Sequence, residues 1–183
     1  MVIAPAPRRS RTVERPDGLE LIVPAKRNVF VVIFLLAWLG GWTFGELSAL
    51  GKLLSGAEGA MGFLFFWLVM WTIGGGFAAF TVLWMLGGHE HIILRPRILA
   101  IRREAFGLGF TREYDLAHAR NLRVSVASYD PFAWGASARF WGFGGGPVAF
   151  DYGAKTVRLA AAVDEPEAAQ IVRELKARHA FPD

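Results

Sequence analysis

The sequence predicts an α+β protein: a two-helix transmembrane hairpin followed by a small β-barrel or sandwich that a C-terminal amphipathic helix caps. Three observations predict this fold class. The 183 residues are 54% hydrophobic and only 20% charged, whereas about a quarter of the residues in soluble domains are charged. The apolar excess lies in two blocks that begin at Val29 and Met61. After Gly88 the apolar residues alternate with polar ones, and the chain ends in a segment of helical periodicity.

The N-terminal segment, residues 1–27, is predicted to lie in the cytoplasm. Up to residue 17 it is rich in Pro, Ala and Arg without periodicity, so we expect it to be disordered. The run Leu19–Val23 has the composition of a short strand, which Pro24 ends. Two alternatives are open for this run: it adds a strand to a neighbouring sheet, or it lies at the membrane surface.

The two apolar blocks predict transmembrane helices at about 28–49 and 61–87, so that the hairpin occupies residues 28–88. Each block holds roughly 20 residues with almost no charge, which is enough to cross a hydrocarbon core of about 30 Å. Buried helices of soluble proteins rarely stay apolar on every side for that length. The first block is too long, and follows too many polar residues, to be a cleaved signal peptide.

The distribution of Lys and Arg predicts the orientation of the hairpin. Basic residues precede the first helix and follow the second, but Lys52 alone lies between the helices. Because cytoplasmic flanks carry the excess of Lys and Arg, both termini are expected in the cytoplasm. Arg is preferred to Lys, with abundant Ala and Gly, which indicates a GC-rich bacterial genome and therefore the bacterial inner membrane. Cysteine is absent, which excludes disulfides, thiol catalysis and cysteine-bound metals.

Glycines in the helices predict where helix backbones approach closely. These residues either pack the hairpin on itself or form a docking face for another membrane protein. The candidate packing face consists of Gly41, Gly45, Gly74, Gly75 and Gly76. Glu46 is the one carboxylate close to the hydrocarbon, and its position indicates the interface. No second acid, His or Lys lies within either helix, so a proton pathway is not expected.

From Gly88 onward the period of two predicts about six short strands, with hairpin turns at Pro96-Arg97 and Gly153-Ala154. The last element predicted is a helix. Asp164 is suited to the N-cap, and Glu167 three residues later completes a pattern like a capping box. The helix carries one apolar stripe, which we expect to cover a sheet face or a barrel mouth.

The segments RILAIRREAFG, REYDLAHARNLRV and AFDYGAKTVRLA, with the helix DEPEAAQIVRELKAR, resemble the bacterial pleckstrin-homology-like (PH-like) domain over residues 89–183. Such domains often follow a transmembrane hairpin in small membrane proteins. The resemblance implies a seven-stranded, strongly bent barrel that the C-terminal helix caps. It implies no activity, because this fold class mostly binds lipids or proteins.

Candidate catalytic and metal motifs are weak, so we expect no enzyme activity, cofactor or metal. The glycines of WGFGGGPVAF precede Pro147 and a strand, not the helix that a phosphate loop needs. They are expected to permit a turn with positive φ and to avoid backbone clashes. His89 and His91 share one side of a strand, but a zinc site needs further ligands. Interfacial residues are the preferred interpretation of this HEH motif.

Two features are candidates for binding. The first is a basic cluster just after the second helix, where each cation contributes about 1 kcal/mol near an anionic leaflet; ordinary topology signalling is its alternative. This cluster is Arg95, Arg97, Arg102 and Arg103. The second is an aromatic segment that fills the core, enters the bilayer or anchors a protein partner. Its members are Phe132, Trp134, Phe140, Trp141 and Phe143.

The sequence favours a non-enzymatic accessory or assembly subunit of a larger membrane complex, with a membrane protein or a second copy of the chain as partner. The alternative is a module that senses anionic membrane lipids through the basic cluster. A channel or carrier of oligomerised hairpins is less favoured, because the helices offer little polarity beyond Thr43, Thr72 and Thr81. The net charge of +4 follows the topology bias, so a nucleic-acid partner is not expected.

Overall fold

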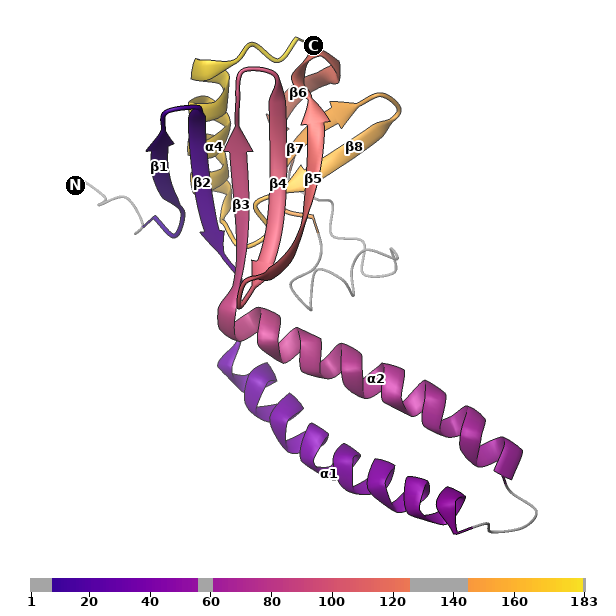
Figure 1. Ribbon diagram of the computed structural model, residues 1–183. Coiled ribbons are helices and arrows are strands. Elements are labelled where there is room, and N and C mark those ends of the chain that lie inside the picture. Colours follow the sequence, from indigo (N-terminus) through magenta and orange to yellow (C-terminus); the bar gives the residue numbers. More distant parts are fainter. Residues whose placement is uncertain (1–7, 56–60, 126–144, 183) are drawn as a thin grey trace, which may run out of the picture. The chain divides into compact units, whose positions relative to one another are not determined.

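The computed structural model describes residues 8–55, 61–125 and 145–182 (Figure 1). The chain divides into two compact units. One is the helical unit, residues 27–86; the other is the sheet unit, which joins residues 1–26 to residues 87–183. The N-terminal segment, expected to be separate from the C-terminal domain, belongs to the same compact unit as that domain.

The sheet unit contains two antiparallel sheets. The first has five strands in the order β1-β2-β3-β4-β5, and the second has three in the order β6-β7-β8. The strands are β1 (Arg11–Arg15), β2 (Gly18–Pro24), β3 (Gly88–Leu94), β4 (Ile98–Ala105), β5 (Leu108–Asp115), β6 (Ala119–Val124), β7 (Val148–Tyr152) and β8 (Lys155–Leu159). In the described part of the chain the two sheets are not joined into a closed barrel, so the barrel that the resemblance implied is wrong and the sandwich alternative is closer.

The helical unit is an insertion between two neighbouring strands. β2 pairs with β3 over six residue pairs, from Leu19↔Leu94 to Pro24↔His89. The N–H of Ala25 then donates to the carbonyl oxygen of Gly88 at 2.9 Å. Both connections to the helices therefore leave the first sheet at the same end, where β2 finishes and β3 begins.

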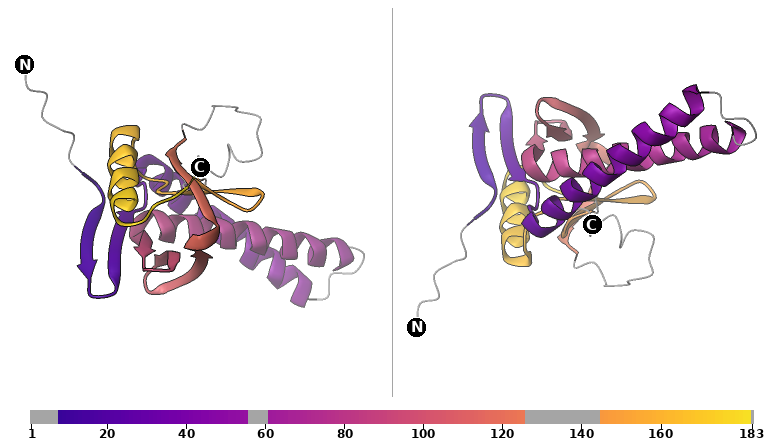
Figure 2. Two further views of the ribbon diagram at one scale, coloured as in Figure 1. Left: turned by 90° about the horizontal axis from the view of Figure 1, so that it is seen from above. Right: turned by 90° about the horizontal axis from the view of Figure 1, so that it is seen from below.

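One apolar core lies between the two sheets and the C-terminal helix α4 (Glu165–Arg178). Strand alternation directs Leu21, Ile92 and Leu99 into it from the first sheet, and Phe150 from the second; all four are fully buried. The apolar stripe of α4 packs on β6 and β7, and Figure 2 shows this helix beside β1 and β2. The predicted N-cap is confirmed, because the Asp164 side chain accepts from the N–H of Glu167 at 3.0 Å.

The expectation of disorder up to residue 17 is wrong for β1. Strand β1 pairs with β2, and its start is tied to α4 because the N–H and hydroxyl of Ser10 both donate to Oε1 of Glu167, each at 2.6 Å. Glu167 thus binds a strand 157 residues away, in addition to its place in the capping pattern. The pairing strand β2 follows β1 directly in sequence, but Glu167 is remote, so the local composition of β1 gave no sign of that contact.

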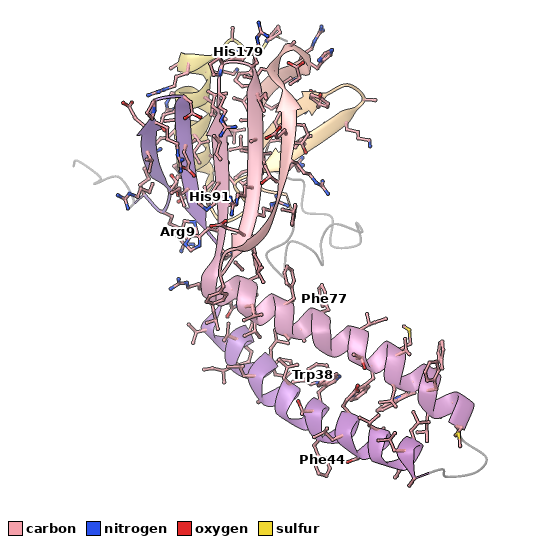
Figure 3. All side chains as sticks on the ribbon, in the orientation of Figure 1. Arg9, Trp38, Phe44, Phe77, His91 and His179 are labelled. Atoms are coloured by element: carbon pink, nitrogen blue, oxygen red, sulfur yellow. The ribbon has the colours of Figure 1, made fainter. Side chains whose placement is uncertain are left out.

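The helical unit consists of α1 (Val29–Leu54) and α2 (Met61–Gly87). Asn28 caps α1, whose end lies several residues beyond the predicted one. At 1.5 Å per residue the helices are about 39 and 40 Å long, which exceeds a hydrocarbon core of about 30 Å. Figure 3 shows Phe44 and Phe77 on the outer sides of the helices, where they are exposed. Both helices are long and apolar enough to cross a membrane.

Candidate anion-binding cleft

A cleft of about 540 Å³ opens between strands β4 and β5 of the first sheet and the β7–β8 hairpin of the second. Among the described residues that line the cleft, four are basic and none is acidic. The lining residues are Ile101, Arg103, Phe110, Arg112, Tyr114, Gly145, Tyr152, Lys155, Thr156, Val157 and Arg158. The cleft therefore combines positive charge with aromatic and apolar surface.

Strand alternation and the edge position of β5 create one wall of the cleft. Ile101 pairs with Arg112 and Arg103 with Phe110, so these side chains share one face of the first sheet. β5 is the last strand of its sheet, and its side chains Phe110 and Arg112 are exposed, whereas Ile101 on β4 belongs to the apolar core. Tyr114 closes the inner end, with its ring edge-on to Phe150 at 5.3 Å between centroids.

The four cations of the cleft differ in how their charge is balanced. Nε and Nη2 of Arg103 donate to Oε1 of the buried Glu90 at 3.0 and 2.9 Å. Arg158 donates to the neutral carbonyl and hydroxyl oxygens of Ser125 at 3.2 and 3.0 Å. Among the described residues no carboxylate oxygen lies within salt-bridge distance of Arg112, Lys155 or Arg158. These three cations therefore leave the cleft with an unbalanced positive charge.

Glu90 holds the wall of the cleft to the end of β8. Its second oxygen, Oε2, accepts from the backbone N–H groups of Ala160 at 2.8 Å and Ala161 at 3.3 Å. Glu90 thereby links Arg103 in the first sheet to the backbone that follows the second. Because a carboxylate that is 4% exposed needs such partners, Glu90 has a structural role.

The predicted basic cluster is not brought together. Arg95 and Arg97 lie in the β3–β4 turn, where Nε of Arg95 is 3.0 Å from Oδ2 of Asp17. Strand β3 has seven residues, and this turn lies at the end opposite to Gly88. At 3.3 Å per residue the turn is about 20 Å from Gly88. Arg102 and Arg103 point to opposite faces of β4, since alternate residues of a strand do so. Of the four arginines, Arg103 alone lines the cleft.

The predicted alternation of the HEH motif is confirmed, with Glu90 buried and His89 and His91 on the other face. No group of three or more possible metal ligands lies in the described residues. His91 lies instead between two carboxylates, with Nδ1 2.8 Å from Glu20 and Nε2 3.3 Å from Glu104. Figure 3 labels His91 on β3.

Glu20 is a buried carboxylate on the outer face of the first sheet. Burial raises the pKa of Glu20, but hydrogen bonds from His91 and Arg15 outweigh burial and hold the pKa below its usual value. Arg102 forms a salt bridge with Glu104 at 2.5 Å. Basic and acidic side chains therefore alternate across this face from β1 to β4. This network could not be predicted from the sequence pattern, because its members come from separate strands.

The predicted packing glycines divide into two groups. The ring of Trp42 lies over Gly75, where an added methyl group would be 2.2 Å from ring atoms. A methyl group added to Gly45 would be 3.6 Å from the ring of Trp71. These two glycines pack the hairpin on itself, as one of the two alternatives expected. The remaining glycines have no atom within 4 Å of that position; they are Gly41, Gly74 and Gly76.

Polar groups inside the helical unit are few and mostly bonded locally. The hydroxyls of Thr43, Thr72 and Thr81 each donate to the carbonyl oxygen four residues earlier. Thr72 also lies 2.5 Å from Oε1 of Glu46, whose other oxygen is buried without a hydrogen-bond partner. Glu46 therefore contributes a polar contact between α1 and α2.

The aromatic segment, with Phe132, Trp134, Phe140, Trp141 and Phe143, lies outside the described residues. At the following glycines the expected positive φ is wrong, because neither Gly145 nor Gly146 has one. Close approach is the physical reason for glycine at Gly146: a methyl group there would lie 2.1 Å from the carbonyl oxygen of Leu159. These glycines bring the chain against β8.

No family model matches the sequence, and no curated protein or solved structure matches it either. The candidate site therefore rests on its own residues. Sequence reasoning missed Arg112, Lys155 and Arg158 because two sheets bring them together. The alternation of Phe110, Arg112 and Tyr114 along one strand was the available signal.

Proposed function

We propose that the chain is a non-enzymatic membrane protein whose two helices span the bilayer and whose sheet unit binds an anionic, phosphate-bearing ligand in the cleft. The observation that carries this proposal is the set of three cations that have no carboxylate partner in the part of the chain that the structure describes. Like charges gathered in a cleft repel one another, and an anion relieves that repulsion. Two of the three are arginines, whose planar forks suit phosphate oxygens.

The surroundings of these cations also support a binding function. Phe110, Tyr114 and Tyr152 supply apolar surface beside the charges, the combination that ligand sites commonly use. The unit's architecture supports a PH-like domain in which the N-terminal hairpin β1–β2 extends the first sheet. Two antiparallel sheets with a C-terminal helix agree with that expectation in outline.

The test is calorimetric titration of the full chain in neutral detergent with short-chain phosphatidylglycerol, and separately with inorganic phosphate. Arg158→Gln is expected to weaken binding by about tenfold to a hundredfold, because a hydrogen bond to a charged group contributes about 1.5–3 kcal/mol. Arg97→Gln is the matched control, with the same charge change outside the cleft. Binding of the lipid but not of phosphate identifies a lipid headgroup as the ligand.

Two outcomes would overturn the cleft as the site. Equal weakening by Arg97→Gln and Arg158→Gln would show that overall charge alone attracts the anion. If Arg97→Gln abolishes binding and Arg158→Gln leaves binding unchanged, the anion binds at the β3–β4 turn, as the predicted basic cluster implies. Absence of binding to both probes would contradict the proposed function.

A second candidate function is the accessory or assembly subunit. The observation that favours it is the open position of Gly41, Gly74 and Gly76 on the hairpin, because small residues allow another helix to approach closely. Gentle extraction of the protein from its membranes, followed by native mass analysis, tests it. A stoichiometric membrane partner that Gly76→Leu releases supports this function; a monomer with bound anionic lipid supports the first.

A further inference from the structure

The β4–β5 hairpin ends in an apolar and exposed tip. Phe106, Leu108 and Phe110 expose 67%, 83% and 51% of their surface. Single exposed apolar side chains are ordinary in soluble proteins, but neighbouring ones at one tip form a patch that indicates an interaction surface. The tip lies entirely within the sheet unit.

The turn at this tip places a bulky residue in an unfavourable backbone conformation. Ala105 pairs with Leu108, so Phe106 and Gly107 are the two central residues, with φ of 52° and 82°. Turns with positive φ at both positions are normally made by Asn, Asp or Gly. A bulky residue in this region is strained, and such strain concentrates at functional sites. Phenylalanine at this position therefore calls for a compensating role outside turn formation.

The tip lies beside the residue at which α2 ends. A methyl group added to Gly87 would be 2.7 Å from Cζ of Phe106, so the aromatic ring covers this glycine. The next residue, Gly88, pairs with Ala105 at the base of the turn. The apolar tip is thus at the end of the first sheet from which α2 departs. The turn with Arg95 and Arg97 is at the other end.

We infer that the tip inserts Phe106 and Leu108 into the interfacial region of the leaflet in which α2 ends. This inference rests on the proposed membrane span, since a spanning α2 places Gly87 close to the boundary of the hydrocarbon. Leu108, Phe110 and Arg112 share one face of β5. Apolar side chains at the tip and a cation farther along the strand match the order of acyl chains and anionic headgroups in a leaflet.

Insertion of the tip also identifies the source of the phosphate group in the proposed function. Phe110 and Arg112 belong both to the face that follows the tip and to the wall of the cleft. An inserted tip therefore places the cleft at the level of the headgroups. The ligand is then a lipid of the same leaflet, not a free phosphate compound.

The absence of cysteine from the sequence allows a direct measurement. Four variants of the full chain each carry one cysteine: Leu108→Cys, Thr111→Cys, Arg97→Cys and Phe44→Cys. A nitroxide label is attached to the cysteine, and each labelled protein is placed in vesicles of phosphatidylcholine with phosphatidylglycerol. Collisions with oxygen and with a water-soluble nickel complex then report whether each label is in lipid or in water. Thr111 is on the opposite face of β5 from Leu108, and Phe44 reports the membrane span itself.

The ratio of oxygen collisions to nickel collisions is expected to be several-fold higher for the label at Leu108 than for the labels at Thr111 and Arg97. A label at Leu108 in water, with the label at Phe44 in lipid, overturns the inference and leaves the membrane span intact. Labels in water at both positions overturn the span and the inference together. In pure phosphatidylcholine the tip is still expected to insert, which separates insertion from recognition of an anionic headgroup.

Discussion

The indole N–H of Trp42 donates to the carbonyl oxygen of Trp71 at 3.1 Å, and the indole N–H of Trp71 donates to the carbonyl oxygen of Trp42 at 3.4 Å. The two rings are nearly parallel, with centroids 6.5 Å apart. Each ring lies over a glycine of the opposite helix, Gly75 or Gly45. This reciprocal contact satisfies both indole donors and fixes the register of α1 against α2.

Gly75 and Gly76 offer a matched pair of substitutions for testing this contact. Gly75→Ala is expected to lower the free energy of unfolding of the hairpin by about 1–3 kcal/mol, because the methyl group overlaps the Trp42 ring. Gly76→Ala is expected to raise it by up to about 1 kcal/mol, because alanine is the better helix former and the position is open. Indole fluorescence of the full chain during titration with SDS measures both. Equal effects would contradict the packing role of Gly75.

A second prediction concerns Glu90, which joins Arg103 to the backbone of Ala160. Glu90→Ala is expected to lower the free energy of unfolding of the sheet unit by about 3–5 kcal/mol, because it leaves a half-buried guanidinium without its counter-charge. Amide hydrogen exchange of the full chain in detergent should show lost protection at Ala160 and Ala161. Glu113→Ala is the control, because Glu113 is exposed on the same sheet. Unchanged exchange at Ala160 would show that Glu90 does not hold β8.

A third prediction concerns Ser10, whose hydroxyl donates to the buried Glu167. Ser10→Ala is expected to weaken the attachment of β1 to α4 by about 1–3 kcal/mol, because one oxygen of a buried carboxylate loses a donor. Limited proteolysis in the N-terminal region should then become faster. Thr12→Ala removes an exposed bond to Glu174 of 3.3 Å and should have little effect. Similar cleavage rates for both variants would assign the attachment of β1 to strand pairing alone.

The sequence predicts those elements whose causes are local. Continuous hydrophobicity indicated both long helices, and the turn at Gly153, which has φ of 58°, was visible from its glycine between alternating runs. By contrast, β1 depends on a carboxylate 157 residues away, and no window around Arg11 contains that information. The separation of Arg102 from Arg103 follows from strand alternation, so it was open to prediction once β4 was recognised. Adjacency in sequence was a poor guide to their adjacency in space.

The candidate site was predictable only in its parts. Alternation placed Phe110, Arg112 and Tyr114 on one side of a strand, but their position at a sheet edge depends on the strand order. Lys155 and Arg158 reach the same cleft because the second sheet packs against the first. Such proximity arises from tertiary packing, which the pattern of a single sequence does not encode in any short segment.

The last prediction concerns Asp151, a half-buried carboxylate that accepts hydrogen bonds from Arg123, Thr156 and Asn121. Hydrogen bonds from Arg123 and then from Thr156 lower the pKa of Asp151 from 3.8 to about 2, against a small opposing effect of burial. A carboxylate whose pKa is lower in the folded state stabilises that state above its unfolded pKa. This contribution is therefore complete above about pH 3.8 and disappears as the pH falls through about 2.

Arg123→Gln removes the largest cause of the shift, so the pKa of Asp151 should return toward 3.8. The variant should be less stable than the wild type above that pH, and the difference should shrink as the pH falls and vanish only well below pH 2, where the carboxyl is protonated in both proteins. Denaturation of the full chain at several pH values measures this difference, with Arg97→Gln as a control for the loss of one cation. If the difference persists unchanged at pH 2, Arg123 stabilises the β6–β7 pair through its hydrogen bond to the carbonyl oxygen of Asn121 and not through the charge of Asp151.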